Sequence, residues 1–225
     1  MINKIAFFDF CETLIDFQTA DAFVDYVRET TKDSRILKFY KLYSLLKKTQ
    51  IIKLLDFITR YKYSINKRLV LLQLRGQEEN FIRGMASKYY EQKIKPHFIL
   101  PIIELLKEKQ RDEWDIVIVS GGYDVYINLF ANEYNISGIM SSQIEFKNGV
   151  CTGLIKGLDC MRNNKVVLLN NKYKRTDFFS VAYSDSITDL PFLKWVDEGW
   201  VVSKYKSQLW PKKYALKEII WTKRK

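Results

Sequence analysis

The chain has 225 residues, enough for one substantial domain or for a core domain with a smaller insertion. Hydrophobic residues make up 47% and charged residues 28%, as in ordinary globular proteins, so disorder, collagen-like repeats and a disulfide scaffold are excluded. The unusual value is the net charge of +11, which indicates nucleic acid, a membrane surface or an anionic substrate as partner.

The first predicted element is a short apolar run at residues 4–10, which is typical of a buried parallel strand. A basic stretch follows: residues 28–95 contain 17 Lys and Arg against 6 Asp and Glu, whereas the rest of the chain is balanced. Apolar residues recur there at helical spacing, so we expect several amphipathic helices. The spacing involves Ile36, Phe39, Tyr40, Tyr43 and Leu46, and then Ile51, Leu54, Leu55 and Ile58.

After Pro96 the pattern alternates between the two kinds of element. Helices are predicted at 99–109, 125–134 and 190–196, and strands at 115–119, 138–142, 177–183 and 200–203. A hairpin over 143–155 is expected to turn at Asn148 and Gly149, a common two-residue hairpin turn. The alternation predicts an α/β fold with a parallel sheet covered by helices on both faces, into which the basic helices are inserted.

The sequence shows no sign of export or of a membrane span. The apolar opening bears Asp9 and lacks a cleavage site, and no apolar run approaches 18 residues. Cys11, Cys151 and Cys160 lack Cys-x-x-Cys spacing, and with a single histidine no zinc site can be assembled. We expect a reduced, cytoplasmic setting, and we interpret His97 as structural.

Polar groups follow predicted strands, at the carboxyl ends where α/β sheets bind ligands. Asp9 follows the first strand and could ligate a cation or attack an electrophile, although an isolated Asp there more often only turns the chain. Ser120, Gly121 and Gly122 follow the next strand and offer a hydroxyl and N–H groups as an anion cradle. The same three residues are also ordinary loop chemistry.

Two further segments, which we also place at strand ends, add charge. Lys165 precedes an apolar run at 166–169 and can neutralise a phosphate, although most lysines are simply solvated. Asp185 and Asp189 lie four residues apart after the strand at 177–183. Two carboxylates at such a turn suit Mg²⁺, and they equally suit the acidic first turn of a helix.

In this order, the four segments resemble the motifs of the haloacid dehalogenase (HAD) superfamily of aspartyl phosphotransferases. Asp9 to Leu14 is similar to its motif Asp-x-Asp-x-Thr-Leu, and Ser184 to Asp189 is similar to Gly-Asp-x-x-x-Asp. Ser120 and Lys165 match the Ser and Lys motifs between them. The resemblance covers the whole predicted core.

The hairpin at 143–155 and the run at 183–193 resemble the phosphoserine-phosphatase-like branch, the HAD-IB hydrolases. In that branch a helical cap is inserted soon after the first motif. The resemblance therefore implies a Rossmann-like three-layer core made of residues 1–15 and 92–225, and an all-helical cap made of residues 16–91.

The resemblance implies a Mg²⁺-dependent phosphatase that acts through an aspartyl phosphate on a small or lipid-linked phosphate. Asp9 would be the nucleophile. Mg²⁺ would be held by Asp9, by Asp185 and by the backbone carbonyl of Cys11. Asp189 would bind the waters of the metal or orient Lys165.

In the same scheme the phosphoryl oxygens would be held by Ser120, Gly121 and Gly122, with Lys165 on the opposite side. Such an arrangement suits phosphoryl transfer, which depends on positioning and on cancelling the charge of the equatorial oxygens.

Cys11 departs from the family pattern, because the family has an Asp there that protonates the leaving oxygen and then activates water. A thiol is a poorer acid and, when neutral, a poor base, and loss of general acid–base catalysis costs about 10²–10⁴-fold. Three alternatives follow: Glu12 takes over the proton, the enzyme is slow or needs an acidic leaving group, or the aspartyl phosphate is long-lived. The rival interpretation is a catalytically impaired phosphate-binding or regulatory protein.

The substrate and partners are less defined by the sequence. Gln18 stands where phosphoserine phosphatases carry an acidic residue for the substrate's amino group, which disfavours phosphoserine. The basic stretch is interpreted as a cap that selects an anionic substrate or, more simply, as a solvated helical face. The absence of a recognition motif disfavours nucleic acid. The basic segment Lys204–Lys225 favours a weak peripheral membrane contact.

Overall fold

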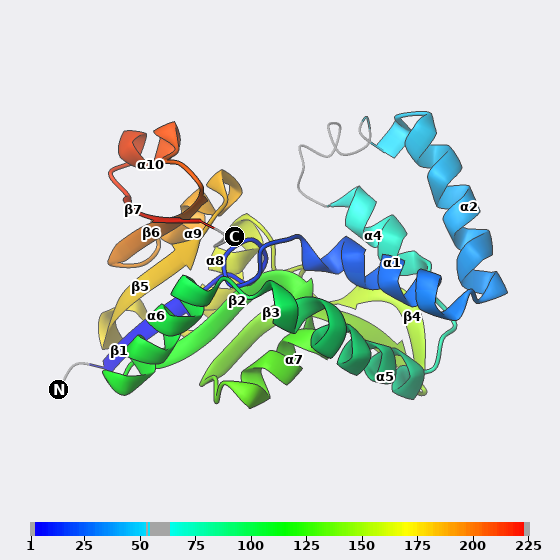
Figure 1. The fold of residues 1–225 in the computed structure, drawn as a ribbon, viewed down its shortest axis with the longest axis horizontal. Helices are drawn as coiled ribbons and strands as arrows, with labels where there is room; N and C mark the ends of the chain where they lie inside the picture. The colour runs from blue at the N-terminus through cyan, green and yellow to red at the C-terminus, as the bar shows by residue number, and fades with distance from the viewer. Residues whose placement is uncertain (1–2, 53, 55–63, 223–225) are drawn as a thin grey trace.

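The computed structural model describes residues 3–52, 54 and 64–222. Its centre is a seven-stranded sheet in the order β4-β3-β2-β1-β5-β6-β7, in which every neighbouring pair is parallel except the β3–β4 hairpin (Figure 1). The strands are β1 (Asn3–Phe8), β2 (Asp115–Tyr123), β3 (Gly138–Lys147), β4 (Val150–Lys156), β5 (Phe178–Ser184), β6 (Glu198–Lys204) and β7 (Lys217–Trp221).

The central strands are buried on both faces, because successive side chains of a strand point to opposite sides. In β1, Phe8 joins an apolar cluster with Leu106 of α6 (Leu100–Arg111) and Phe130 of α7 (Asp124–Glu133). Phe7 joins a second cluster with Leu169 of α8 (Asn163–Lys172) and with α9 (Leu190–Leu193). The two clusters are the cores of a three-layer α/β fold, as predicted.

Residues 16–91, which we call the helical insert, leave the sheet after β1 and return before β2. The helices among its described residues are α1 (Thr19–Thr31), α2 (Ser34–Lys48), α4 (Ile65–Leu72) and α5 (Glu79–Tyr89). Figure 1 shows α2 standing away from the sheet, whereas α4 packs against β4 and α5 lies beside α7 of the core. The division into a core and a cap at residues 15 and 91 stays a prediction.

Local signals explain where the insert helices begin. The Asp33 side chain caps α2 by accepting hydrogen bonds from the backbone N–H groups of Arg35 and Ile36. The Ser64 hydroxyl accepts one from the N–H of Lys67 at the start of α4. Both are preferred residues at this position because their oxygens satisfy N–H groups that the first turn leaves free. Of the second predicted helical run in the insert, residues 55–58 lie outside the described residues.

Several predicted elements match closely. The β3–β4 hairpin turns at Asn148 and Gly149, which both have positive φ (52° and 74°), as a type I′ turn requires. The strand expected at 115–119 continues to Tyr123. The helix expected at 190–196 follows a short 3₁₀ turn (Ile187–Asp189) and already ends at Leu193.

The C-terminal segment contains more regular structure than its amphipathic pattern indicated. It contains the short helix α10 (Leu209–Lys213) and then β7, which pairs in parallel with β6 at the edge of the sheet. None of the helices in the described part of the chain is long and apolar enough to cross a membrane.

Candidate functional site

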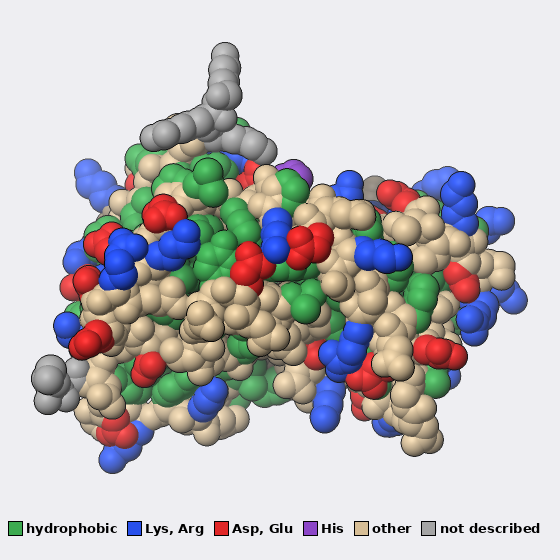
Figure 2. Space-filling model, turned by 60° about the horizontal axis from the view of Figure 1, so that its bottom comes forward, with side chains coloured by type: hydrophobic (Ala, Val, Ile, Leu, Met, Phe, Trp, Pro, Cys, Tyr) green, Lys and Arg blue, Asp and Glu red, His purple; other side chains and the backbone are tan. Residues whose placement is uncertain are grey.

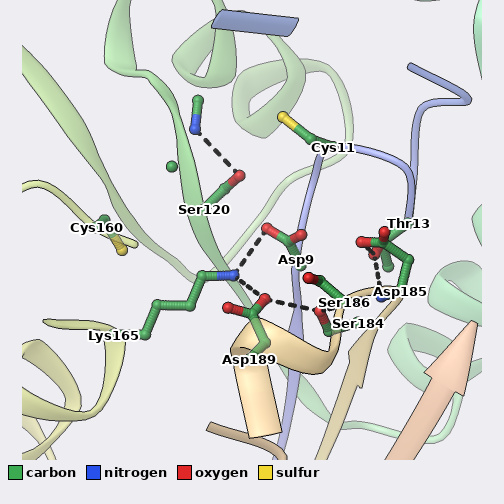
Figure 3. A network of polar contacts seen from close by, with 12 residues as sticks. Asp9, Cys11, Thr13, Ser120, Cys160, Lys165, Ser184, Asp185, Ser186 and Asp189 are labelled. Carbon is green, nitrogen blue, oxygen red and sulfur yellow. Dashed lines mark hydrogen bonds and ion pairs between the residues drawn. The ribbon is translucent and has the colours of Figure 1, made fainter. Parts of the chain in front are cut away.

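Asp9 lies at the carboxyl end of β1 and is the centre of a polar cluster. Its backbone N–H donates to the carbonyl of Tyr183 in β5 (2.9 Å), and its side chain is almost fully buried. Because β1 lies between β2 and β5, the polar residues that follow those strands emerge on either side of Asp9 (Figure 3). The sheet order therefore brings together residues that are more than one hundred positions apart in sequence.

Lys165 forms ion pairs with two carboxylates, those of Asp9 and Asp189. Its Nζ lies 3.0 Å from Asp9 Oδ1 and 2.5 Å from Asp189 Oδ2, and the same Oδ2 accepts a 2.7 Å hydrogen bond from the Ser184 hydroxyl. Burial alone would lower the pKa of Lys165, but Asp189 and Asp9 outweigh it and raise that pKa. Lys165 is therefore a fixed positive charge.

One expectation about Lys165 was wrong. We placed it at the end of a strand, whereas it lies in the first turn of α8, a helix that packs on the sheet. The helix still aims its ammonium at the strand ends (Figure 3).

Asp185 is held by Thr13, which lies in the turn after β1. The Thr13 hydroxyl donates to Asp185 Oδ1 (3.3 Å) and accepts from the Asp185 backbone N–H (3.1 Å). Burial, and then the charges of Asp9, Glu12 and Asp189, raise the pKa of Asp185 to about 8. Burial also raises the pKa of Asp9, which Lys165 opposes.

These carboxylates fit a hard divalent cation. In the described part of the chain no three His, Cys, Asp or Glu side chains gather into a metal cage. Mg²⁺ does not need one, because it binds one or two carboxylates and keeps several waters. Asp9 and Asp185 could hold it with the backbone carbonyl of Cys11, and a cation there would relieve their repulsion. Asp189 is bound to Lys165 and Ser184, which favours its orienting role.

The Ser120-Gly121-Gly122 segment ends β2 beside Asp9. Ser120 is fully buried, and its Oγ accepts a 3.2 Å hydrogen bond from the N–H of Gly122. A Cβ at Gly121 would lie 2.6 Å from Cγ of Met161, so any larger residue would force that side chain to move. At Gly122 a Cβ would lie 2.8 Å from the side chain of Ile127. Both glycines thus permit close packing around the segment.

The predicted residues gather around one cavity of about 230 Å³. Lining it are Asp9, Cys11, Ser120, Gly121, Lys165, Asp185 and Asp189. Of the predicted site residues only Gly122 does not line it, and its N–H is bound to Ser120. The helical insert contributes Gln18, Asp21, Asn66 and Lys67 to the wall. The cavity therefore lies between the core and the insert.

The Cys11 side chain is almost fully buried and belongs to a hydrogen-bonded group of side chains. Its Sγ lies 3.0 Å from the hydroxyl of Thr19, which in turn lies 2.9 Å from the hydroxyl of Tyr126. Burial, and then the charge of Asp9, raise the pKa of Cys11 to about 11. The thiol is therefore neutral at physiological pH and does not act as a base.

Glu12 lies next to Cys11 but is solvent-exposed. It has a positive φ (54°), and its carboxylate accepts a hydrogen bond from the side-chain amide of Gln18. His97 lies at the surface, with its Nδ1 2.8 Å from the carbonyl of Lys93 and its ring against Phe17. His97 does not line the cavity.

Lys67 lines the cavity and was not singled out from the sequence. It comes from α4 of the insert and is 4% exposed, and its Nζ lies 2.5 Å from both the Gly121 carbonyl and Asp159 Oδ1, and 2.8 Å from Ser142 Oγ. A side chain of the insert thus reaches the backbone of the Ser120-Gly121-Gly122 segment. No sequence signal distinguishes Lys67 from the other basic residues of the insert.

Comparison with known proteins gives a consistent family and fold. Residues 6–194 match the family model described as haloacid dehalogenase-like hydrolase. A search of curated protein sequences finds no match.

Solved structures share the fold at low sequence identity. A protein of unknown function from Bordetella pertussis Tohama I has a TM-score of 0.77 at 16% identity, covering 97% of this chain and 99% of that one. A HAD family hydrolase from Salmonella enterica serovar Typhi has a TM-score of 0.66 at 16% identity, covering 97% and 67%. A substrate-bound phosphoserine phosphatase has a TM-score of 0.63 at 17% identity, covering 97% and 93%.

The first prediction concerns the buried pair of Lys67 and Asp159. We expect Lys67→Met to lower the free energy of unfolding by about 3–5 kcal/mol, because it leaves Asp159 buried without its counter-ion. Urea denaturation measures this. The double variant Lys67→Met/Asp159→Leu is the control and should recover most of the loss, because an apolar pair removes both charges. A single variant as stable as the wild type would show that the pair does not hold the insert.

Proposed function

This chain belongs to the haloacid dehalogenase-like hydrolase family and is an enzyme of that hydrolase type, and from this premise we propose what reaction it catalyses. It is a Mg²⁺-dependent phosphatase that acts on a phosphate monoester through an aspartyl phosphate. The observation that carries this proposal is the contact of Lys165 with both Asp9 and Asp189 on the wall of a cavity that Ser120 and Gly121 also line.

In the first step, a carboxylate oxygen of Asp9 attacks phosphorus as the bond to the leaving oxygen breaks. The ammonium of Lys165 and the Ser120 hydroxyl bind the phosphoryl oxygens, whose negative charge must be cancelled in the transition state. In the second step, water attacks the aspartyl phosphate, which releases inorganic phosphate and restores Asp9. Mg²⁺, held by Asp9, Asp185 and the Cys11 carbonyl, would supply the positive charge that lets an anionic nucleophile meet an anionic substrate.

The described residues around Asp9 offer no evident group for proton transfer. The leaving oxygen needs a proton and the attacking water must lose one, but the pKa of the Cys11 thiol is about 11. Glu12 is exposed and bound to Gln18, which is not the placement of a base inside the cavity. We therefore propose that the enzyme is slow on alkyl phosphates and faster on substrates with acidic leaving groups.

The same observation keeps a second function open. A protein with the phosphate-binding groups of this cavity but a neutral thiol at Cys11 could bind phosphate compounds without turning them over. Such a binding or regulatory protein would still need Lys165 and Ser120. It differs from the enzyme in needing no nucleophile at Asp9.

The substrate is proposed to be a small or lipid-linked phosphate. The cavity of about 230 Å³ has room for a phosphate and a small leaving group. The side chain of Asp21, held by a 2.8 Å hydrogen bond from the amide of Asn66, lines this cavity and also a second one of about 450 Å³ inside the insert. A longer leaving group could extend past Asp21. Because Gln18 is neutral and bound to Glu12, phosphoserine stays disfavoured.

The second prediction tests the nucleophile. Asp9→Asn should reduce the kcat for p-nitrophenyl phosphate with Mg²⁺ by at least about a thousandfold, because the amide cannot form the phosphoryl-enzyme. Steady-state kinetics measure this, with Asp115→Asn, an exposed carboxylate at the opposite end of β2, as the control. No turnover by the wild type on a broad panel of phosphates, with phosphate binding intact, would support the binding protein instead.

The third prediction concerns Cys11. Cys11→Asp should raise the kcat for an alkyl phosphate monoester by about 10²–10⁴-fold, because it restores a general acid and base, and it should have a smaller effect on an aryl phosphate. Cys11→Ser keeps the size of the side chain without a usable acid and should give no gain. If Cys11→Asp also gives none while the wild type is already fast, another group transfers the proton.

The fourth prediction concerns the cation. Mg²⁺ should raise the Tm of the wild type, since an ion that binds only the folded state stabilises it by mass action. Asp185→Asn should abolish this rise, because it removes one of the two carboxylates proposed to hold the ion. Differential scanning fluorimetry measures both, with Asp115→Asn as the matched control. An equal rise in Asp185→Asn would place the ion elsewhere.

A further inference from the structure

The outer face of α2 has a composition that the catalytic proposal does not use. The helix (Ser34–Lys48) contains no acidic residue of its own. Asp33 caps its first turn, and Asp21 and Asp25 of α1 lie near its last turn, where they line a cavity with Lys47 and Lys48. Its basic residues are Arg35, Lys38, Lys41, Lys47 and Lys48, all solvent-exposed. Figure 1 places α2 at the end of the molecule remote from β1, and Figure 2 shows Lys and Arg side chains at that end with some Asp and Glu side chains between them.

The same face exposes apolar side chains. Ile36 and Tyr43 are buried and attach α2 to the rest of the insert. Leu42 is 57% exposed and Leu45 is 59% exposed. One exposed leucine needs no explanation, but two adjacent ones on a single helix, each more than half exposed, form a patch that is unusual for a solvated surface.

Helical spacing places these leucines among the lysines. Residues three, four and seven positions apart lie on one side of a helix. Lys38, Lys41, Leu42, Leu45 and Lys48 therefore share one face, which we call the α2 face. The α2 face thus combines apolar side chains with surrounding lysines and contains no acidic residue of its own.

We propose that the α2 face is a docking surface for anionic membranes. A helix that lies in a membrane interface places leucines at the boundary of the acyl chains, while lysines pair with lipid phosphates. Leu42 and Leu45 would provide the inserted side chains. Lys38, Lys41 and Lys48 would provide the attraction to negatively charged headgroups. The proposal does not depend on turnover at Asp9.

Other occupants fit the α2 face less well. A nucleic acid would use the lysines but would leave Leu42 and Leu45 without a role, because the phosphate backbone binds through charge. A second copy of the chain would place two α2 faces against each other, and like charges in such a contact repel. An anionic lipid surface uses both kinds of side chain.

The α2 face also borders the second cavity. That cavity, of about 450 Å³, is lined by Tyr40, Lys47 and Lys48 of α2, and by Asp21, which lines the catalytic cavity as well. A membrane docked on α2 would thus lie next to a space that adjoins the proposed site. This position suits a lipid-linked phosphate, although docking itself requires no particular substrate.

Vesicle co-sedimentation of the full chain tests the proposal. We expect binding to vesicles of phosphatidylcholine and phosphatidylglycerol in equal parts, weakening as salt is added, and little binding to phosphatidylcholine alone. The variant Lys38→Gln/Lys41→Gln/Lys48→Gln should bind roughly a hundredfold more weakly, given the contribution of each lysine near an anionic surface. The variant Leu42→Ser/Leu45→Ser should bind at least about tenfold more weakly, because it loses the apolar contact.

The C-terminal basic segment provides matched controls. Lys206→Gln/Lys212→Gln/Lys213→Gln removes the same number of exposed charges, and Leu209→Ser removes a leucine that is 94% exposed. Both should bind anionic vesicles as the wild type does. If these controls lose as much binding as the α2 variants, or if the α2 variants lose none, the α2 face is not the docking surface.

Two further measurements separate this proposal from its rivals. Absence of vesicle binding, together with duplex DNA binding or self-association that the α2 variants abolish, would overturn it. Turnover of p-nitrophenyl phosphate without vesicles should be unchanged in every α2 variant that retains the wild-type Tm. Vesicle binding by a chain that shows no turnover would support docking and refute only the proposed catalysis.

Discussion

The burial of negative charge at one edge of the sheet is the constraint on which the site depends. Asp9, Asp185 and Asp189 lie in one cavity, and a buried carboxylate is costly unless it is paired and hydrogen-bonded. Lys165 pairs with Asp9 and Asp189, and Asp185 has the hydroxyl of Thr13. Only one positive charge accompanies three carboxylates, so burial and then the neighbouring negative charges raise the pKa of Asp185 to about 8. A divalent cation is the simplest compensation, and it would also allow an anionic phosphate to approach.

Much of this arrangement could be predicted from the sequence, because it follows from topology. The carboxyl ends of parallel strands lie at the same edge of a sheet. Asp9, Ser120 and Asp185 were therefore expected to converge once the three strands before them had been identified. Each motif was weak alone, and their order made the family recognisable. Lys165 was placed on the wrong kind of element, because the apolar run that follows it is short and has no pronounced helical stripe. Its ammonium nevertheless reaches the same point from α8.

The parts that the sequence did not predict depend on tertiary contacts. Lys67 is one of many lysines in the insert, and only the folded chain shows that Asp159, Ser142 and Gly121 surround it. β7 was missed because its five residues include two adjacent isoleucines and show no alternation of apolar and polar side chains, whereas pairing with β6 makes it a strand. Such contacts join residues distant in sequence, and neither spacing nor composition reports them.

The structure also changes what the charge of the insert means. Of the described insert residues that line the catalytic cavity, only Lys67 is basic, and it is already paired with Asp159. Asp21 and Gln18 add no positive charge there. The excess charge therefore does not act mainly by selecting an anionic substrate inside the cavity. It lies outside, above all on α2, where a solvated helix would need neither the leucines between the lysines nor the complete absence of acidic residues. The positive charge of this protein is thus better understood as a property of its surface, and its catalytic chemistry as a property of the nearly balanced core.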